Sequence, residues 1–174
     1  MFGTPVPQSQ VPVGADCDDA RSGALSLAGA DLSNCLLSDR NLTGADLTGA
    51  NLTQANLART ILSASDLTGA MAVGANLEDA LLVGATLTNA NLAFSLLALA
   101  DATGADFTGA QITDADLENA TFAGATIASA QFDSSNLTGA NFTGASGTPT
   151  VAGAVFSLTT CPDSSISNGV TCWV

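Results

Sequence analysis

One pentapeptide, Ala45-Asp46-Leu47-Thr48-Gly49, displays the repeat that determines the fold of this 174-residue chain. Every fifth residue from Leu27 to Phe142 falls at the position of Leu47, and 22 of these 24 residues are Leu, Ile or Phe. Ala stands two residues before this position in 17 of the 24 units. A strict short period is a strong indication of architecture, and it predicts a fold made of stacked, repeated units.

A period of five residues fits neither the 3.6-residue turn of an α-helix nor the two-residue alternation of a strand. We therefore expect short extended segments joined by turns. Ala45 and Leu47 are two residues apart and should point inward, whereas Asp46 and Thr48 should point outward. Gly49 should form the turn, because glycine adopts positive φ angles without steric cost.

Two stretches resemble the repeats of the pentapeptide repeat protein family: Ala45-Asp46-Leu47-Thr48-Gly49-Ala50-Asn51-Leu52-Thr53 and Ala105-Asp106-Phe107-Thr108-Gly109. The resemblance covers residues 25–144. It implies an all-β fold, a right-handed quadrilateral β-helix, which is a solenoid with four pentapeptides per coil. The 24 units would then form about six coils with residues i and i+20 as vertical neighbours. Consistent with this phase, Ala occupies positions 30, 50, 70, 90, 110 and 130 without exception.

We expect one domain with three parts: an N-terminal cap segment at residues 1–24, the β-helix at 25–145 and a C-terminal cap at 146–174. Caps are needed because the ends of a stack of coils expose unpaired strand edges. The repeat fails at Gly147 and Pro149 and resumes once, shifted, at residues 154–158. Phe156, Ile166 and Trp173 are the candidate plugs of this end.

Four cysteines lie near the ends of the predicted rod: Cys17 and Cys35 at one end, Cys161 and Cys172 at the other. An even count with one pair at each end predicts two disulfides that hold the caps and an extracytoplasmic location (periplasm, lumen or secreted). The alternative is four thiols in a cytoplasmic protein. Because the chain has no His and neither pair has a Cys-x₂-Cys spacing, zinc is disfavoured. The first residues have neither a basic region nor an apolar core, so we expect no signal peptide in this sequence, and a mature form from which one was removed would look the same.

The net charge is −13, with only three Lys and Arg residues together. This balance excludes proteins that bind nucleic-acid phosphates directly, which need clustered cations. The chain has no apolar run of the length that a membrane span requires, so we expect no membrane insertion. The aromatic content of 5% predicts an interior too narrow for rings.

Two arginines occupy unusual places in the repeat. Arg40 stands at an inward Ala position, where an uncompensated guanidinium is costly, so either the wall bulges or the side chain bends outward. Arg59 falls between Asp39 and Asp79 in one corner column, which predicts a ladder of three exposed charges.

Two groups of outward residues are candidate functional features. Asp46, Asp66 and Asp106 share one outward column and form an acidic face; one flat wall cannot wrap a cation, so we expect a solvated surface and no metal site. Apolar residues also stand at outward or corner positions of coils three and four, and they predict an interface with a protein partner or a second copy. These residues are Met71, Val73, Leu81, Val83, Phe94, Leu96 and Leu99.

Catalysis is disfavoured, because the chain has no His, Lys or Tyr and a filled rod offers no cleft. We expect no catalytic residues and no cofactor. The sequence therefore favours a non-enzymatic structural or protein-interaction solenoid whose target is not encoded in an evident motif. The family resemblance implies an alternative, a DNA-mimic inhibitor of a type II topoisomerase. The chain departs from such members in its cysteine pairs and in lacking an evident C-terminal dimerising helix and a loop between coils.

Overall fold

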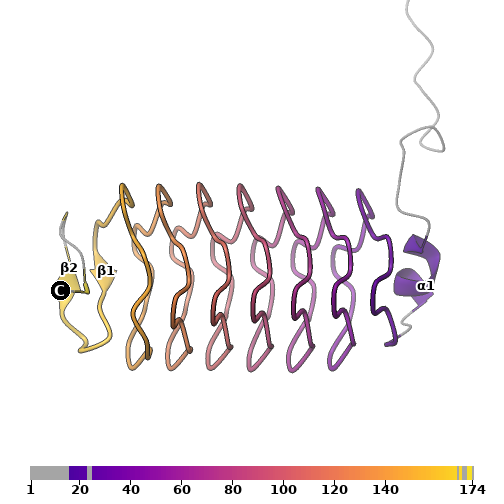
Figure 1. Ribbon diagram of the computed structural model, residues 1–174, viewed down its shortest axis with the longest axis horizontal. Helices are drawn as coiled ribbons and strands as arrows, with labels where there is room; N and C mark the ends of the chain where they lie inside the picture. Colours follow the sequence, from indigo (N-terminus) through magenta and orange to yellow (C-terminus); the bar gives the residue numbers. More distant parts are fainter. Residues whose placement is uncertain (1–15, 23–24, 168, 170–171, 174) are drawn as a thin grey trace, which may run out of the picture.

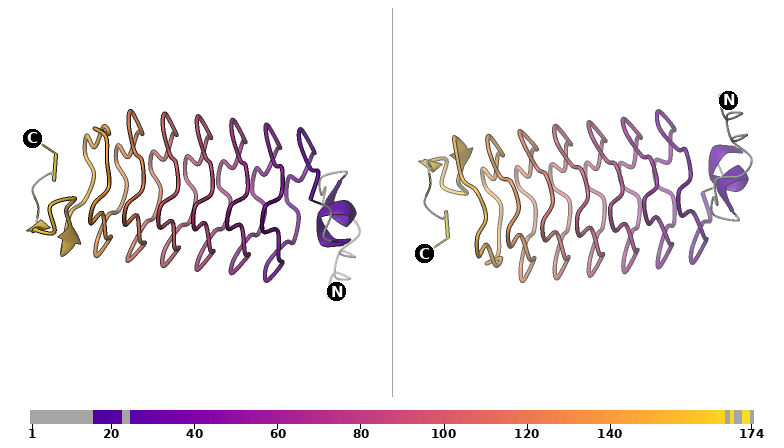
Figure 2. Two further views of the ribbon diagram at one scale, coloured as in Figure 1. Left: turned by 90° about the horizontal axis from the view of Figure 1, so that it is seen from below. Right: turned by 90° about the horizontal axis from the view of Figure 1, so that it is seen from above.

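The computed structural model describes residues 16–22, 25–167, 169 and 172–173. The chain winds into a stack of similar coils (Figure 1), with helix α1 (Cys17–Ser22) at one end and strands β1 (Thr159–Thr160) and β2 (Ile166–Ser167) at the other. Seen from below and from above (Figure 2), at right angles to the view of Figure 1, the coils show the same regular stacking, so the molecule is a rod. Most of the predicted N-terminal cap segment, residues 1–15, 23 and 24, lies outside the described residues.

Parallel bridges join residues 20 apart along the rod. They form four columns that start at Ser26, Asp31, Leu36 and Asn41, and we call the surfaces that carry these columns the first, second, third and fourth sides. Twenty residues therefore complete one coil, and the predicted relation between residues i and i+20 is confirmed. Coils one to six comprise residues 25–44, 45–64, 65–84, 85–104, 105–124 and 125–144.

Each side ends in a tight turn. At Gly49 the φ angle is 64°, and the N–H of Ala50 donates to the carbonyl of Leu47 at 2.9 Å. A single positive φ at the third residue of the turn is typical of a type II turn. Positive φ recurs at all 24 corners from residue 29 to residue 144, and 13 of these corner residues are not glycine. The turn predicted at Gly49 is confirmed, but the fold also accepts side chains at its corners.

The interior is filled by the inward residues of every coil. Leu47 and Ala50 are fully buried, like most residues at their positions. Four phenylalanines are fully buried as well, and their ring centroids lie 5.0–5.8 Å apart. The expectation of an interior too narrow for rings is therefore wrong. Ala102 lies one coil from Phe122 in the same inward column, and its small side chain leaves volume for the ring. The four buried phenylalanines are Phe107, Phe122, Phe132 and Phe142.

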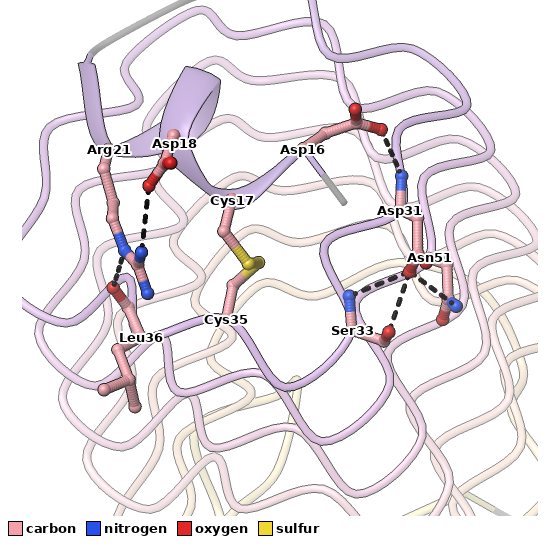
Figure 3. Close-up of a disulfide and its surroundings, with 9 residues drawn as sticks. All are labelled: Asp16, Cys17, Asp18, Arg21, Asp31, Ser33, Cys35, Leu36 and Asn51. Atoms are coloured by element: carbon pink, nitrogen blue, oxygen red, sulfur yellow. Dashed lines mark hydrogen bonds and ion pairs between the residues drawn. A yellow bond between two sulfur atoms is a disulfide. The ribbon is translucent and has the colours of Figure 1, made fainter. Parts of the chain in front are cut away.

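Helix α1 and the residue before it cover the first coil (Figure 3). Asp16 makes the two hydrogen bonds to Asp31 that a further coil would otherwise make. Its N–H donates to the carbonyl of Asp31 at 3.1 Å, and its carboxylate accepts the N–H of Asp31 at 2.8 Å. Arg21 donates from Nε to the carbonyl of Leu36 at 3.4 Å. The cap thus satisfies backbone groups that the end of the stack would otherwise leave unpaired.

All four cysteines form the two predicted disulfides, Cys17–Cys35 and Cys161–Cys172. The first disulfide joins α1 to the inward wall of coil one and is buried. The second joins the residue after β1 to the C-terminal segment. Each disulfide therefore ties one end of the rod.

Beyond coil six the stack continues with a shifted register. Ser146 still bridges Thr126 at a spacing of 20, but the next three bridges have a spacing of 19. One unit is therefore a residue short, and it contains Gly147 and Pro149, where the sequence pattern fails. The shifted stretch is longer than the single unit predicted at 154–158. The shifted bridges are Gln131 with Thr150, Asn136 with Val155, and Asn141 with Thr160.

Strands β1 and β2 form an antiparallel pair that closes this end. Of the three predicted plugs, Phe156 is buried and Trp173 packs against Phe142 and Phe156. The prediction for Ile166 is wrong, because it is 55% exposed. Successive residues of β2 face opposite ways, and Ser167 takes the buried position.

Arg40 keeps the regular backbone pattern of the coil, and Ile61 donates to its carbonyl at 2.8 Å. The regular backbone contradicts the expected bulge of the wall, and the side chain of Arg40 is exposed. The physical reason is its place in the first coil, where Leu25 at an equivalent position is also exposed. No helix among the described residues is long and apolar enough to cross a membrane.

Candidate functional site

The acidic column, which we define as Asp46, Asp66 and Asp106, lies on the first side as predicted. Asp46 bridges Asp66, which bridges Thr86, and Thr86 in turn bridges Asp106. Each carboxylate accepts the N–H of the threonine two residues later, at 3.1, 2.9 and 2.9 Å respectively. The side chain thus satisfies a turn N–H, the arrangement called an Asx turn.

The same bond recurs over all four sides with either Asp or Asn as the acceptor, so the bond depends on the side-chain oxygen and not on the charge. The residues that form it elsewhere in the coils are Asp31, Asn41, Asn51, Asn56, Asn76, Asn91, Asp101, Asp116, Asn136 and Asn141. The sequence analysis missed this structural role. The sequence did contain a sign of this role, because an Asp or Asn stands two residues before the residue that donates the turn N–H.

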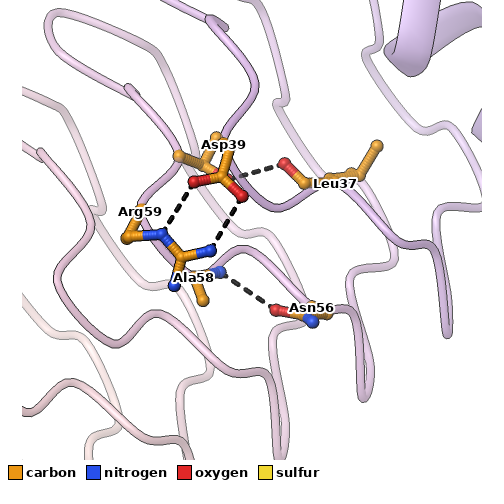
Figure 4. Close-up of polar contacts among 6 residues, drawn as sticks. Leu37, Asp39, Asn56, Ala58 and Arg59 are labelled. Atoms are coloured by element: carbon orange, nitrogen blue, oxygen red, sulfur yellow. Dashed lines mark hydrogen bonds and ion pairs between the residues drawn. The ribbon is translucent and has the colours of Figure 1, made fainter.

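The charges of the rod surface interact mainly with local hydrogen-bond donors. The hydroxyl and N–H of Thr48 lower the pKa of the Asp46 carboxyl. Arg59 donates to both carboxylate oxygens of Asp39 at 2.7 and 2.8 Å (Figure 4) and lowers the pKa of that carboxyl. In the predicted ladder of three charges, Arg59 binds Asp39, whereas Asp79 acts on it through its charge.

Metal-ligand geometry is not found among the described residues, where no group of three or more His, Cys, Asp or Glu side chains could hold an ion. A shallow depression of about 280 Å³ lies at the C-terminal end. Its one acidic lining residue, Asp163, accepts hydrogen bonds from Ser165 that lower the pKa of its carboxyl. A carboxyl with a lowered pKa is ionised at neutral pH and is a poor general acid. The lining residues are Ala145, Gly147, Thr148, Pro162, Asp163, Cys172 and Trp173.

The predicted apolar interface is divided among three sides of the rod. Met71 and Val73 lie on the second side, and Leu81 and Val83 lie on the fourth. Val73 is half-buried, whereas the other three are 40–48% exposed. The structure therefore does not bring the seven predicted residues into one patch.

The remaining three residues do lie together, on the third side of coil four. Phe94 and Leu99 occupy the two corners that bound this side, and Leu96 occupies its bridged wall position. Phe94 is 62% exposed, Leu96 is 46% exposed and Leu99 is 55% exposed. We call Phe94, Leu96 and Leu99 the apolar band.

Further exposed apolar residues, which are not part of the predicted interface, lie at the ends of the rod. Leu25 and Leu36 are in coil one, and Val155, Leu158 and Ile166 follow coil six. Leu36 and Val155 stand in the same bridged column as Leu96, near the two ends of the third side. The apolar band differs from them because one inner coil combines an exposed wall leucine with exposed apolar residues at both adjacent corners.

The family model described as pentapeptide repeats matches this chain in 8 copies, over residues 26–63, 41–79, 60–93, 80–119 and 115–146. These matches span more than half of the chain. Among curated protein sequences, none matches it.

Several solved structures are similar. HetL, a pentapeptide repeat protein involved in the regulation of heterocyst differentiation in the cyanobacterium Nostoc sp. strain PCC 7120, is 29% identical, with a TM-score of 0.55 over 82% of this chain and 74% of its own. A pentapeptide repeat protein from the thylakoid lumen of Arabidopsis thaliana is 33% identical, with a TM-score of 0.53 over 54% of this chain and 66% of its own. Rfr23 from the cyanobacterium Cyanothece 51142 is 27% identical, with a TM-score of 0.54 over 63% of this chain and 85% of its own.

Proposed function

Because the chain belongs to the pentapeptide repeat family and has its right-handed quadrilateral β-helix fold, we propose that it is a non-enzymatic structural or protein-interaction element. The observation that carries this proposal is the exposure of apolar side chains in coils three and four, where the repeat elsewhere places polar residues. Exposed apolar surface in the middle of a regular polar wall is typical of a contact site. The fold by itself does not assign the function.

The chemistry of the surface supports a non-catalytic role. The carboxylates of the acidic column accept turn N–H groups, and Asp163 in the depression at the C-terminal end accepts the N–H of Ser165 in the same way. The chain has no His, Lys or Tyr to form a catalytic pair with these carboxylates. Acid–base and nucleophilic catalysis need such a pair within hydrogen-bond reach.

We place the protein in an oxidising compartment outside the cytoplasm. Two disulfides support this placement, since disulfides persist where thiols are not kept reduced. The similarity to a thylakoid-lumen protein points the same way. Intact mass after alkylation under native, non-reducing conditions tests it: four alkylated cysteines in protein isolated from its source would overturn the placement.

The interaction role is tested by capture and direct binding. The disulfide-bonded protein is immobilised beside a variant in which the seven apolar residues of coils three and four are replaced by Asn, Thr or Gly, the residues of the regular repeat. We expect at least one protein to bind the natural chain and to lose binding to the variant, with the contact reproduced by the purified pair. If both rods retain the same proteins, the proposed role is wrong.

The alternative, mimicry of DNA toward a type II topoisomerase, is favoured by the net charge of −13 and by the rod shape. A supercoiling assay with added protein tests it, and inhibition at micromolar concentration would support it. We prefer the interaction role, because the acidic column is interrupted at Thr86 and its carboxylates take part in turns.

A further inference from the structure

The apolar band on the third side of coil four is not required by the fold. Directly beside Leu96, in coils three and five, the same wall position holds Asn76 and Asp116. Each of these accepts the N–H two residues later, at 2.9 and 3.1 Å. A leucine side chain has no oxygen that could accept the corresponding N–H of Ala98, so Leu96 gives up a bond that its neighbours make.

The corners of the band are also unfavourable for the chain itself. Phe94 and Leu99 have φ angles of 60° and 63°. Side chains with a Cβ are disfavoured in this left-handed region, and bulky apolar ones have no local hydrogen bond to offset the strain. Strained residues that persist in a structure cluster at functional sites. Two adjacent corners of one coil therefore carry exposed apolar side chains at the expense of local stability.

Carboxylates flank the band on both sides. In coil three, Glu78 and Asp79 are exposed on the third side and its corner. In coil five, the corner before the wall holds Asp114 and the wall itself holds Asp116 and Glu118. Backbone bonds place these rows against the band, since Asp79 donates its N–H to Ala98 at 2.9 Å and Leu99 donates its N–H to Glu118 at 2.9 Å. Arg59, the cation of the same corner column, is bound to Asp39.

This arrangement defines the chemistry of its partner. A strip of apolar side chains with acidic rows on both edges complements a segment whose apolar side chains lie in line between lysines or arginines. An α-helix is about 10 Å across, and neighbouring coils are about 4.8 Å apart. A helix whose apolar stripe lies along coil four therefore places its flanking residues over coils three and five, where the carboxylates are.

Resting on the proposed interaction role, we infer that the apolar band binds a cationic amphipathic helix of another protein. A second copy of this chain does not fit, because two such faces would bring carboxylate rows against carboxylate rows. The chain has only three arginines and no lysine to offset that repulsion. The bound helix lies across the rod, with hydrophobic contacts to Phe94, Leu96 and Leu99 and with its basic residues over the acidic rows.

The test uses a model peptide of about 18 residues, with leucines along one helical face and lysines on both flanks, and a matched peptide with glutamate for lysine. Each is titrated against the full-length, disulfide-bonded protein by calorimetry. The band variant is Phe94→Gly, Leu96→Asn and Leu99→Gly. The control variant removes as many apolar side chains from the second and fourth sides, by Met71→Asn, Leu81→Asn and Val83→Thr. Both variants keep the net charge, so non-specific attraction of the lysine peptide is equal for them.

We expect the lysine peptide to bind the natural chain and the control variant alike, and the band variant at least about tenfold more weakly, as expected for removal of central apolar anchors. Binding should weaken as salt is added. Equal binding to the band and control variants, or no binding to the natural chain, would overturn the inference. So would equal binding of the glutamate peptide, or self-association of the natural chain that the band variant loses.

Failure of this inference is distinguishable from failure of the proposed function. Both variants are also used in the capture experiment with the protein's own partners. If the control variant loses a captured partner and the band variant keeps it, the interaction role stands and the band is not the contact. Thermal unfolding checks that both variants are folded.

Discussion

The aspartates of the acidic column on the first side and Leu96 of the apolar band on the third side occupy equivalent wall positions of the repeat, yet they relate to the fold in opposite ways. Asp106 accepts the N–H and the hydroxyl of Thr108 at 2.9 and 2.6 Å, so it stabilises the turn that follows it. Leu96 stands at the same position and makes no such bond, and the corners beside it are strained. In a regular rod, a side chain that fits the repeat is explained by the fold. A side chain that departs from the repeat, such as Leu96, needs an explanation outside the fold.

The largest expected effect distinguishes an inward residue from an outward residue of the wall that carries the apolar band. Leu97 points inward and is fully buried, whereas the adjacent Leu96 is 46% exposed. Leu97→Ala should lower the free energy of unfolding by about 2–5 kcal/mol, because it removes buried methylene groups and leaves a cavity. Leu96→Ala, the matched control, should change it by less than about 0.5 kcal/mol. Urea unfolding followed by circular dichroism measures both, and equal losses would contradict the inward and outward assignment.

The next effect concerns the acidic column. Asp106→Leu, which copies the residue at position 96, should lower the free energy of unfolding by about 1–2 kcal/mol, because it leaves a turn N–H and a hydroxyl without their acceptor. Asp106→Asn keeps an oxygen in the same place and should be nearly neutral. If the two variants are equally destabilised, the carboxylate matters for its charge, and the structural interpretation of the acidic column is wrong.

A substitution at a corner of the apolar band should stabilise the rod. Leu99→Gly relieves a bulky residue at positive φ and should raise the free energy of unfolding by about 0.5–1 kcal/mol, the strain relieved less the added entropy of the unfolded chain. Gly49→Leu is the reciprocal control at a corner with φ of 64° and open space around it, so no clash contributes. It should lower stability by a similar amount. A destabilising Leu99→Gly would mean that the band serves the fold after all.

The positions compared here could be assigned from the sequence, since the period of five and the invariant Ala column fix which residues point inward and which lie 20 apart. Both disulfides could also be predicted, because each cysteine pair lies near one end of the repeat. The division of the seven apolar residues among three sides was accessible too, by counting positions in units of 20. The predicted interface grouped them by coil and ignored the side.

Other features depend on contacts that have no period. Helix α1 has six residues, too few to be stable alone, and it is held by Asp16, Arg21 and the Cys17–Cys35 disulfide. The four buried phenylalanines depend on how the inward residues of coils five and six share volume. The sequence predicts a shift near Pro149, but the length of the shifted stretch and the exposure of Ile166 follow from how the last strands close the rod. Such contacts cannot be read from one sequence.

The smallest effect is a pH dependence at Asp46 of the acidic column. The hydrogen bonds from Thr48 hold the pKa of Asp46 below its ordinary value of 3.8 in the folded rod. Between the ordinary and the lowered value the unfolded chain binds more protons than the folded one, so the contribution of Asp46 is complete above 3.8 and is lost as the pH falls through the lowered pKa. Asp46→Asn keeps the acceptor and removes the titration. Relief of the general negative charge on acidification is nearly the same in both proteins and cancels in their difference. The melting temperature of the natural chain should therefore fall relative to that of the Asn variant only at pH values below 3.8. If the two melting temperatures change together at every pH, the bond from Thr48 does not depend on the ionisation of Asp46.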